Sequence, residues 1–238
     1  EENLYADMDG EQQELYDAHV RRMKLMLEEK SDEEIRTDKI EILAELTRLR
    51  QLCCDPALLY DNYKGGSAKT ELVRGLIRNA VENGHKVLLF SQFTTMLERL
   101  YRILEEEKIA SHMLTGATPK EKRIEMVESF AHDEVPVFCI SLKAGGTGLN
   151  LTGADIVIHY DPWWNVAVEN QATDRAHRIG QKNVVTVYKL IAKGTIEEKI
   201  IKLQQMKKEL AEEILSGDEI KTASFQREEL LELLEERF

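Results

Sequence analysis

Short, almost wholly apolar runs alternate with amphipathic stretches through the middle of the chain. The apolar runs occupy residues 87–90, 137–140, 156–160 and 184–191. The amphipathic stretches, with apolar residues at helical spacing, occupy residues 71–82, 95–107, 120–130 and 165–178. Strands in which polar residues do not alternate are buried on both faces, as in a parallel sheet covered by helices. The pattern predicts a three-layered α/β domain.

Helical spacing also dominates before this domain. Residues 12–27 predict one helix. Ser31 and Glu34 have the spacing of a capping box that opens a second helix, which we expect to continue to Leu52. The glycine-containing stretch 60–67 is the expected linker to the domain.

A long helix is expected after the domain. Thr195 and Glu198 have capping-box spacing, apolar residues follow at helical spacing, and Gly217 is a suitable helix end. The acidic, Leu-rich stretch 228–238 is expected to form one more helix. We therefore divide the chain into an N-terminal strand with helices and a linker at 1–68, the α/β domain at 69–194 and C-terminal helices at 195–238.

Acidic residues are concentrated at the two ends of the chain. The 238 residues carry a net charge of −12, but the middle, 69–194, has 15 acidic and 16 basic side chains. Residues 1–68 carry 17 acidic and 9 basic side chains, and residues 195–238 carry 12 and 7. A polyanion could therefore bind a local cluster of bases in the middle, while the acidic flanks could dock a protein partner.

Composition excludes several classes of protein. With 42% hydrophobic and 32% charged residues, the chain has the makeup of a globular fold. No apolar run approaches the ~18 residues that a membrane-spanning helix needs, so no membrane contact is expected. The three cysteines, Cys53, Cys54 and Cys139, form neither a disulfide framework nor a zinc spacing. We therefore expect a reducing cytoplasm or nucleus.

The polar residues that follow the predicted strands are the first candidates for a functional site. Ligands of a parallel α/β sheet gather at the carboxyl ends of its strands. The exits carry Ser91-Gln92, Ser141 with the glycine loop that follows it, and Trp163-Trp164. The tryptophans could belong to the core, but two indoles after a proline at a strand exit favour a contact surface. We expect all three exits to lie along one edge.

The glycine loop contains Gly145, Gly146 and Gly148 and is followed by Asn150. Glycines let backbone N–H groups approach an anion closely. The loop is not a dinucleotide-binding fingerprint, because Leu151 takes the place of the third glycine, and the chain holds no phosphate loop of the G-x-x-x-x-G-K-[ST] type. From the residues alone, a phosphate contact and a plain turn are equal alternatives.

An arginine stripe follows the next exit. Gln171, Arg175 and Arg178 are spaced i, i+4, i+7 and share one face of the predicted helix. Guanidinium groups match phosphate oxygens and stay charged at any relevant pH, so the stripe suits a phosphate group. The alternative is a solvated face on which the arginines pair with Glu169 or Asp174.

Other bases are placed to touch a nucleic-acid backbone. Arg123 and Lys143, with Lys120 and Lys122, are the best placed of these, and simple solvation is the alternative. The string His-Asp-Glu at 132–134 resembles an acidic metal site, but it precedes its strand rather than ending one. We therefore expect a surface turn there and no metal site.

Six strings of the sequence, taken in order, resemble the second, C-terminal RecA-like lobe of the Swi/Snf family of DNA-dependent ATPases, within the superfamily-two helicases. They are LRQLCCDPALL at 49–59, FSQF at 90–93, SLKAGGTGLNLT at 141–152, DPWWN at 161–165, QATDRAHRIGQ at 171–181 and GTIEEKI at 194–200. Two departures from the family pattern are Val166, where a proline is usual, and Thr115, where an aspartate is usual. The resemblance implies a RecA-like parallel sheet with helices on both faces, an N-terminal helical protrusion and a C-terminal brace helix.

The resemblance also implies roles for individual residues. Arg178 and Arg175 would be arginine fingers that reach the γ-phosphate of ATP, and Gln171 would order that site. ATP with Mg²⁺ would be held mainly by a first RecA-like lobe of the same polypeptide. The residues that would bind the nucleotide on this lobe are Gly145, Gly146, Gly148 and Asn150. The residues that would contact DNA are Ser91, Gln92, Arg123, Ser141, Lys143, Trp163 and Trp164.

The function that the resemblance implies is that of a second motor lobe in an ATP-dependent double-stranded-DNA translocase that remodels protein–DNA complexes. Without a phosphate loop, the 238-residue chain by itself is expected not to hydrolyse ATP. One alternative is lobe two of a strand-separating helicase, against which the DPWW and HRIGQ strings speak. Another is a free-standing nucleic-acid-binding or protein-docking module. The expected location is the cytoplasm in a bacterium or archaeon and the nucleus in a eukaryote.

Overall fold

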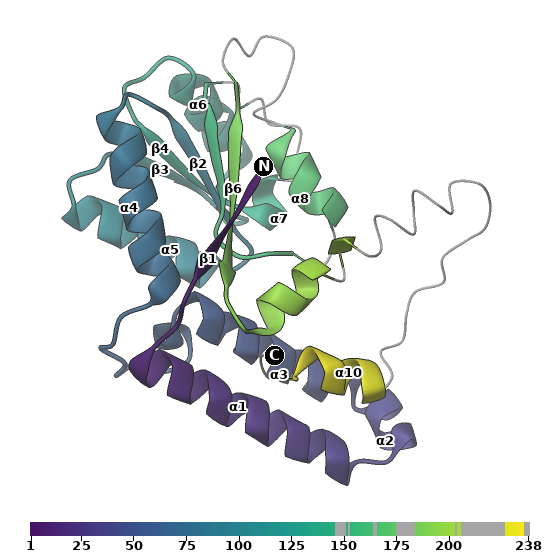
Figure 1. The fold of residues 1–238 in the computed structure, drawn as a ribbon. Helices are drawn as coiled ribbons and strands as arrows, with labels where there is room; N and C mark the ends of the chain where they lie inside the picture. Colours follow the sequence, from purple (N-terminus) through teal and green to yellow (C-terminus); the bar gives the residue numbers. More distant parts are fainter. Residues whose placement is uncertain are drawn as a thin grey trace. The chain divides into compact units, whose positions relative to one another are not determined.

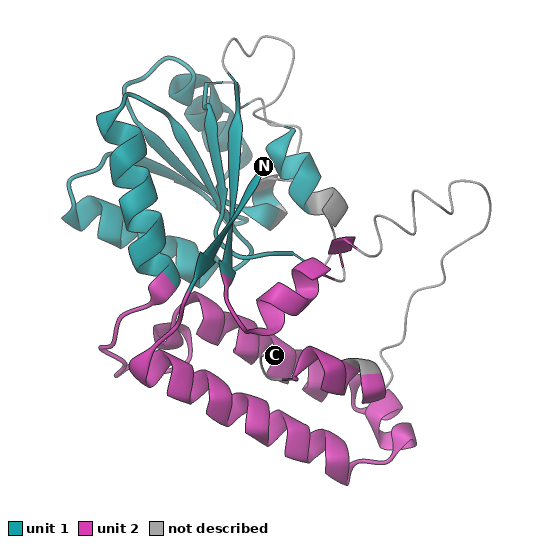
Figure 2. Cartoon of the chain, viewed as in Figure 1, with its two compact units in different colours: residues 1–6, 69–191 teal, residues 7–68, 192–238 magenta. Residues whose placement is uncertain are grey.

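Figure 1 shows the fold in a computed structural model, which describes residues 1–145, 151, 153–163, 166–174, 184–202, 204–205 and 227–235. The chain divides into two units, which are coloured separately in Figure 2. Unit 1 comprises Glu1–Ala6 and Lys69–Ile191, and unit 2 comprises Asp7–Ala68 and Ala192–Phe238. Each unit therefore combines an N-terminal segment with a later one.

Unit 1 is built on a six-stranded sheet of order β1-β6-β5-β2-β4-β3. The strands are β1 Glu2–Ala6, β2 Val87–Ser91, β3 Ser111–Leu114, β4 Val137–Ser141, β5 Ile156–His159 and β6 Thr186–Ala192. The pairs β3–β4, β4–β2, β2–β5 and β5–β6 are parallel. β2 and β4 are buried along their whole length. The predicted α/β fold with a parallel sheet is confirmed.

Helices cover both faces of this sheet. They are α4 Ala68–Glu82, α5 Thr94–Glu106, α6 Lys120–Phe130, α7 Leu142–Gly145 and α8 Val166–Thr173. Figure 1 shows α4 and α5 in front of the sheet and α6 behind it. Phe130 of α6, Leu142 of α7 and Ala172 of α8 share one apolar cluster with Phe90 and Phe138 of the strands. This cluster is the core beneath one helical layer.

The edge strand β3 was not predicted. Its sequence, Ser-His-Met-Leu, is short, and its first three residues are only partly buried. An edge strand pairs on one side only, so its residues need not be apolar. Hydrophobic periodicity therefore gives no signal for this strand.

In unit 2, the second predicted helix is divided at Asp38. The helices are α1 Gly10–Glu29, α2 Asp32–Thr37, α3 Lys39–Cys54, the 3₁₀ helix η1 Pro56–Leu58 and α10 Arg227–Leu233. The capping box is confirmed, because Ser31 N–H donates to Glu34 Oε2 at 2.7 Å and Glu34 N–H donates to Ser31 Oγ at 3.3 Å. The prediction of one helix running to Leu52 is wrong, since Asp38 ends α2 and precedes the first residue of α3.

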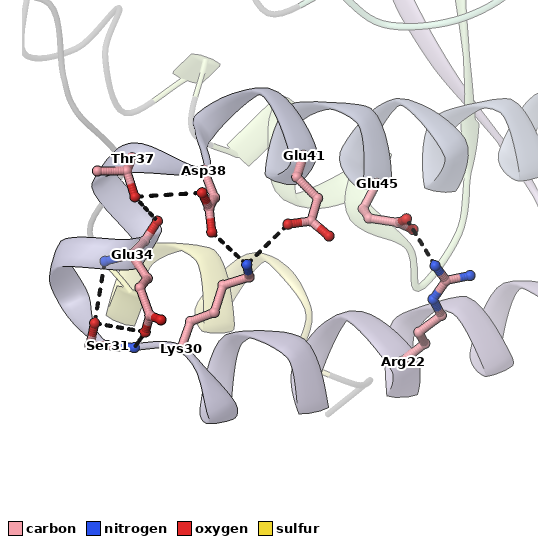
Figure 3. A network of polar contacts seen from close by, with 8 residues as sticks. All are labelled: Arg22, Lys30, Ser31, Glu34, Thr37, Asp38, Glu41 and Glu45. Atoms are coloured by element: carbon pink, nitrogen blue, oxygen red, sulfur yellow. Dashed lines mark hydrogen bonds and ion pairs between the residues drawn. The ribbon is translucent and has the colours of Figure 1, made fainter.

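Side chains around this break form the network drawn in Figure 3. Lys30 Nζ lies 2.6 Å from Asp38 Oδ2 and 3.0 Å from Glu41 Oε2. Hydrogen bonds to these two carboxylates raise the pKa of Lys30 above its ordinary value. Lys30 thus bridges the residue at the break and the first turn of α3, a contact that no helical spacing rule describes.

The C-terminal part of unit 2 packs on α1 and α2. Ile196 N–H donates to Tyr16 Oη of α1 at 2.7 Å, and burial raises the pKa of Tyr16 well above its ordinary value. In α10, Arg227 Nε lies 3.0 Å from Asp32 Oδ1, and Leu230 is buried. None of the helices in the described part of the chain is long and apolar enough to span a bilayer.

The helix that begins after Thr195 is capped differently from the prediction. Residues 196–202 are helical. Thr195 Oγ1 accepts from Glu197 N–H at 3.2 Å, while the Glu198 carboxylate accepts from Gly194 N–H at 2.8 Å instead of from Thr195. Both side chains still satisfy free N–H groups near the helix start, so capping is retained with a shift of one residue. The predicted helix end at Gly217 lies outside the described residues.

We predict that Tyr16→Phe lowers the free energy of unfolding by ~1–3 kcal/mol, because it leaves the buried Ile196 N–H without its acceptor. Urea unfolding followed by circular dichroism measures the change. The control is Tyr5→Phe, since Tyr5 is 48% exposed. A Tyr16→Phe loss no larger than that of the control would contradict the prediction.

Candidate functional site

Three of the predicted strand exits lie side by side. β4, β2 and β5 are neighbours in the sheet, and β2 is parallel to both of the others, so their carboxyl ends share one edge. Ser91 at the end of β2 is aligned with Ser141 at the end of β4, and both are buried. The sheet therefore brings together Ser91, Gln92 and Ser141, as predicted from the order of the strands.

Asp161 joins two of these exits and was not singled out from the sequence. It is fully buried, and its carboxylate accepts a hydrogen bond from Ser91 Oγ and one from Gln92 N–H at 3.4 Å. Ser91 Oγ in turn accepts from Phe93 N–H at 3.1 Å. A buried carboxylate has to be hydrogen-bonded, so the exits of β2 and β5 are held to each other. An aspartate directly after an apolar strand was the available signal.

Lys69 is a second buried charge at this edge that sequence reasoning missed. It is fully buried at the start of α4, and its Nζ donates to the carbonyl of Tyr160 at 2.7 Å. The same ammonium lies 5.2 Å from the centroid of the Tyr160 ring, in a cation–π contact. Thr70 Oγ1 lies 3.0 Å from the Tyr160 hydroxyl. The beginning of α4 is therefore attached to the exit of β5.

Trp163 and Gln171 face different surroundings. Trp163 is partly buried and packs against the core cluster, so the core alternative applies to part of its indole. Its backbone N–H donates to Glu169 Oε2 of α8 at 3.2 Å. Gln171, two residues further along α8, is exposed. Gln171 is thus presented away from the sheet, where an external ligand can reach it.

Arg123 uses its guanidinium within unit 1. It donates from Nε to Thr118 O at 2.7 Å, and from Nη2 to Gly116 O at 2.9 Å and to Thr115 O at 3.3 Å. These bonds order the loop after β3, the loop that contains the Thr115 departure. Arg123 therefore shapes a loop in this structure, in addition to any contact that it makes with a phosphate.

The His-Asp-Glu string at 132–134 lies in a turn before β4. Asp133 accepts from Lys86 Nζ at 3.1 Å and from Ser129 Oγ at 3.1 Å, and it lies 2.8 Å from His112 Nε2. Its hydrogen bonds outweigh partial burial and lower the pKa of the Asp133 carboxyl. Within the described part of the chain, no group of three His, Cys, Asp or Glu side chains is arranged to hold a metal ion.

The remaining predicted site residues lie either in the short helix after β4 or outside the described part of the chain. Lys143 and Gly145 belong to the short helix α7, which occupies the start of the predicted glycine loop. The residues that lie outside the described part of the chain are Gly146, Gly148, Asn150, Trp164, Arg175 and Arg178. The roles expected for these six residues stay predictions.

His159, the last residue of β5, also went unnoticed in the sequence. It is buried, and its ring stacks on Phe90 with 5.5 Å between the centroids. Burial lowers its pKa to about 4, while the nearby Glu169 carboxylate acts in the opposite direction. His159 is therefore neutral at physiological pH and serves as a polar core residue.

The chain is similar in sequence and in fold to known ATP-dependent helicases and SWI2/SNF2 ATPases. A family model described as Helicase conserved C-terminal domain matches residues 68–180. An uncharacterized ATP-dependent helicase of Mycoplasma pneumoniae is 39% identical over 98% of this chain and 22% of its own length, so the chain spans about a fifth of that relative. The Sulfolobus solfataricus SWI2/SNF2 ATPase C-terminal domain superposes with a TM-score of 0.80 at 31% identity, covering 100% of this chain and 98% of that one. The Sulfolobus solfataricus SWI2/SNF2 ATPase core in complex with dsDNA gives a TM-score of 0.75 at 33% identity, covering 90% of this chain and 45% of that one.

We predict that acid destabilises the protein partly through His159. The unfolded histidine binds a proton near pH 6.5, whereas the native one resists protonation down to about pH 4. The contribution of His159 to the free energy of unfolding is therefore fully present above pH 6.5. It falls as the pH is lowered towards 4, by roughly 1.4 kcal/mol per pH unit at most. His159→Gln should reduce the slope of unfolding free energy against pH in this window, as measured by urea unfolding.

His132→Gln is the matched control, because His132 is exposed. It should keep the wild-type slope. Equal slopes for wild type and His159→Gln would show that protonation of this buried ring does not limit acid stability.

Proposed function

Because the chain belongs to the SWI2/SNF2 ATPase family, as its C-terminal helicase domain, we propose that it is the second motor lobe of an ATP-driven double-stranded-DNA translocase. The observation that carries this proposal is the match, over the full length of the chain, to a SWI2/SNF2 ATPase C-terminal domain. The parent protein would use ATP hydrolysis to remodel protein–DNA contacts without separating the strands.

The nucleotide chemistry would be shared between two lobes. Transfer of the γ-phosphoryl group to water spreads negative charge over its oxygens, and positioned cations stabilise that charge. A first lobe would hold ATP and Mg²⁺. This lobe would add Arg175 and Arg178 from the segment after α8, with Gln171 ordering the approach. The exposure of Gln171 supports this assignment, since a residue of the cleft has to be reachable from outside the lobe.

DNA would lie along the edge formed by the strand exits. Lys143 follows β4 by two residues, next to the glycine loop, and a phosphate backbone is bound by such cations without reference to base sequence. Ser91, Gln92 and Ser141 line the same edge of the sheet. The relative solved with dsDNA supports double-stranded DNA as the ligand class.

A strand-separating helicase is the competing function. The observation that favours it is the helicase description shared by the family model and the Mycoplasma relative. A strand-displacement assay on the full-length protein decides between the two. A translocase displaces a DNA-bound protein or triplex strand but leaves the duplex intact, whereas a helicase releases single strands.

We predict that Arg178→Ala in the full-length protein lowers the DNA-stimulated kcat by ~10³ or more while DNA affinity stays nearly unchanged. A finger acts only when the lobes close, so its contact is stronger in the transition state than in the ground state. Arg178→Lys should rescue poorly, because a point charge does not reproduce the planar guanidinium. Arg175→Ala should have a similar or somewhat smaller effect.

Steady-state ATPase assays and a DNA-binding titration measure both quantities. Arg36→Ala is a matched control, since Arg36 lies in α2 of unit 2 and is exposed. Full turnover with lost DNA affinity in Arg178→Ala would make the stripe a DNA contact and would overturn the assignment.

We predict that Lys143→Ala weakens binding about equally on unrelated duplexes and reduces the slope of log affinity against log salt by about one. The reason is that a phosphate contact releases counterions without reading bases. Fluorescence anisotropy over a salt series measures the effect. Loss confined to one DNA sequence would instead indicate base readout.

A further inference from the structure

Four polar side chains attach α8 to the sheet, and we call them the α8 anchor: Glu169 and Thr173 on the helix, His159 on β5 and Lys189 on β6. Glu169 Oε1 lies 2.8 Å from Lys189 Nζ, and His159 Nε2 lies 2.9 Å from Thr173 Oγ1. Figure 1 shows α8 beside the β5–β6 side of the sheet. The helix is therefore held by polar contacts as well as by apolar packing.

The anchor residues on the sheet are neighbours, and so are the anchor residues on the helix. His159 and Lys189 are directly paired in the register of β5 and β6. Glu169 and Thr173 are four residues apart, so they lie one turn apart on the same face of α8. One rung of the sheet therefore holds two successive turns of the helix, which fixes both the position of α8 along the sheet and its rotation about its own axis.

Hydrogen-bond directions within the anchor are consistent with one another. Thr173 Oγ1 donates to Glu169 O at 3.2 Å, so its oxygen accepts from the His159 Nε2–H. His159 is then neutral with its proton on Nε2, and its buried Nδ1 has no partner among the described residues. Buried polar networks of this kind specify one arrangement of the groups that they join.

Glu169 extends the anchor to the strand exit. Its second carboxylate oxygen accepts from Trp163 N–H at 3.2 Å, and Lys189 Nζ also lies 3.4 Å from the Oε2 atom of Glu1, the residue before β1. Glu169 is only 1% exposed, and Lys189 is mostly buried. A buried carboxylate that loses its cation is left uncompensated, so this ion pair resists rearrangement of the helix.

We propose that the α8 anchor sets the rotation of α8, so that Glu169, Thr173, His159 and Lys189 are positioning residues for the ATPase step. Gln171 lies on the opposite, exposed side of the same helix, and Arg175 follows Thr173 by two residues. A small rotation of α8 would move Gln171 and redirect the chain that leads to both arginines. The inference rests on the proposed function of those residues. The anchor itself touches no substrate.

The test compares Thr173→Val with Thr173→Ser in the full-length protein. Valine keeps the shape of the side chain but removes the hydroxyl that joins His159 to the helix, whereas serine keeps the hydroxyl. Thr173→Val should lower the DNA-stimulated kcat about 10-fold, with KM for ATP and the DNA Kd within about 2-fold, since small misplacement of reacting groups is felt in the chemical step. Thr173→Ser should stay within about 2-fold of wild type in all three.

The matched control is Thr47→Val. Thr47 lies within α3, and like Thr173 it donates from its hydroxyl to the carbonyl four residues before it, at 2.7 Å in Thr47 and 3.2 Å in Thr173. Unlike Thr173, it is exposed and far from the anchor in sequence. It should leave turnover unchanged. A second pair, Glu169→Gln and Lys189→Arg, tests the ion pair. The first removes the charge and should lower kcat, while the second keeps the charge and should retain most of it.

Arg178→Ala is run in the same assays to separate the two proposals. If Arg178→Ala loses turnover and Thr173→Val does not, the anchor inference is overturned and the proposed function stands. If Arg178→Ala keeps full turnover, the proposed function fails, and the anchor inference fails with it. Equal losses for Thr173→Val and Thr173→Ser, or a loss that appears in KM rather than kcat, would assign the anchor a purely structural role. Far-UV circular dichroism of each variant at the assay temperature shows that the losses do not come from unfolding.

Discussion

Parallel pairing of β4, β2 and β5 is the constraint from which the rest of unit 1 follows. It places the carboxyl ends of three buried strands at one edge of the sheet. Where a strand ends in a buried place, its last backbone N–H and C=O groups need hydrogen-bond partners. The residues at this edge satisfy one another: Ser91 with Asp161, and Lys69 with the carbonyl of Tyr160. The strand exits at this edge are thus joined to each other and to α4 by buried hydrogen bonds.

Buried charges at this edge have a common arrangement. Asp161, Lys69 and Glu169 are each almost completely removed from solvent, and each bonds a group on a different element of the sheet or its helices. Such groups are costly to bury unless they are paired, and they then favour one geometry over alternatives. The function that we propose would need that property, because a cation that stabilises a transition state contributes only when it is held in place.

Much of the fold could be predicted from the sequence because the responsible signals are local. Apolar runs without alternation predicted β2, β4 and β5, and helical spacing predicted α4, α5 and α6. The capping box at Ser31 was visible as a spacing of three residues. The strings that resemble the Swi/Snf family identified the class of the chain, which the full-length structural match bears out. These features depend on neighbours in sequence or on motifs that remain readable without coordinates.

What only the tertiary structure decided depends on partners that are distant in sequence. The break at Asp38 involves Lys30, and Arg123 is occupied by carbonyls of a loop whose backbone the sequence does not describe. The burial of Lys69 could not be predicted either, because a lysine in a polar stretch looks solvated until its partner is placed. The sequence by itself determined the buried strands β2, β4 and β5, the helices α4, α5 and α6, and the family. The pairing of Glu169 with Lys189, twenty residues apart, arose only when the sheet brought β6 beneath α8, since an ion pair depends on distance in space.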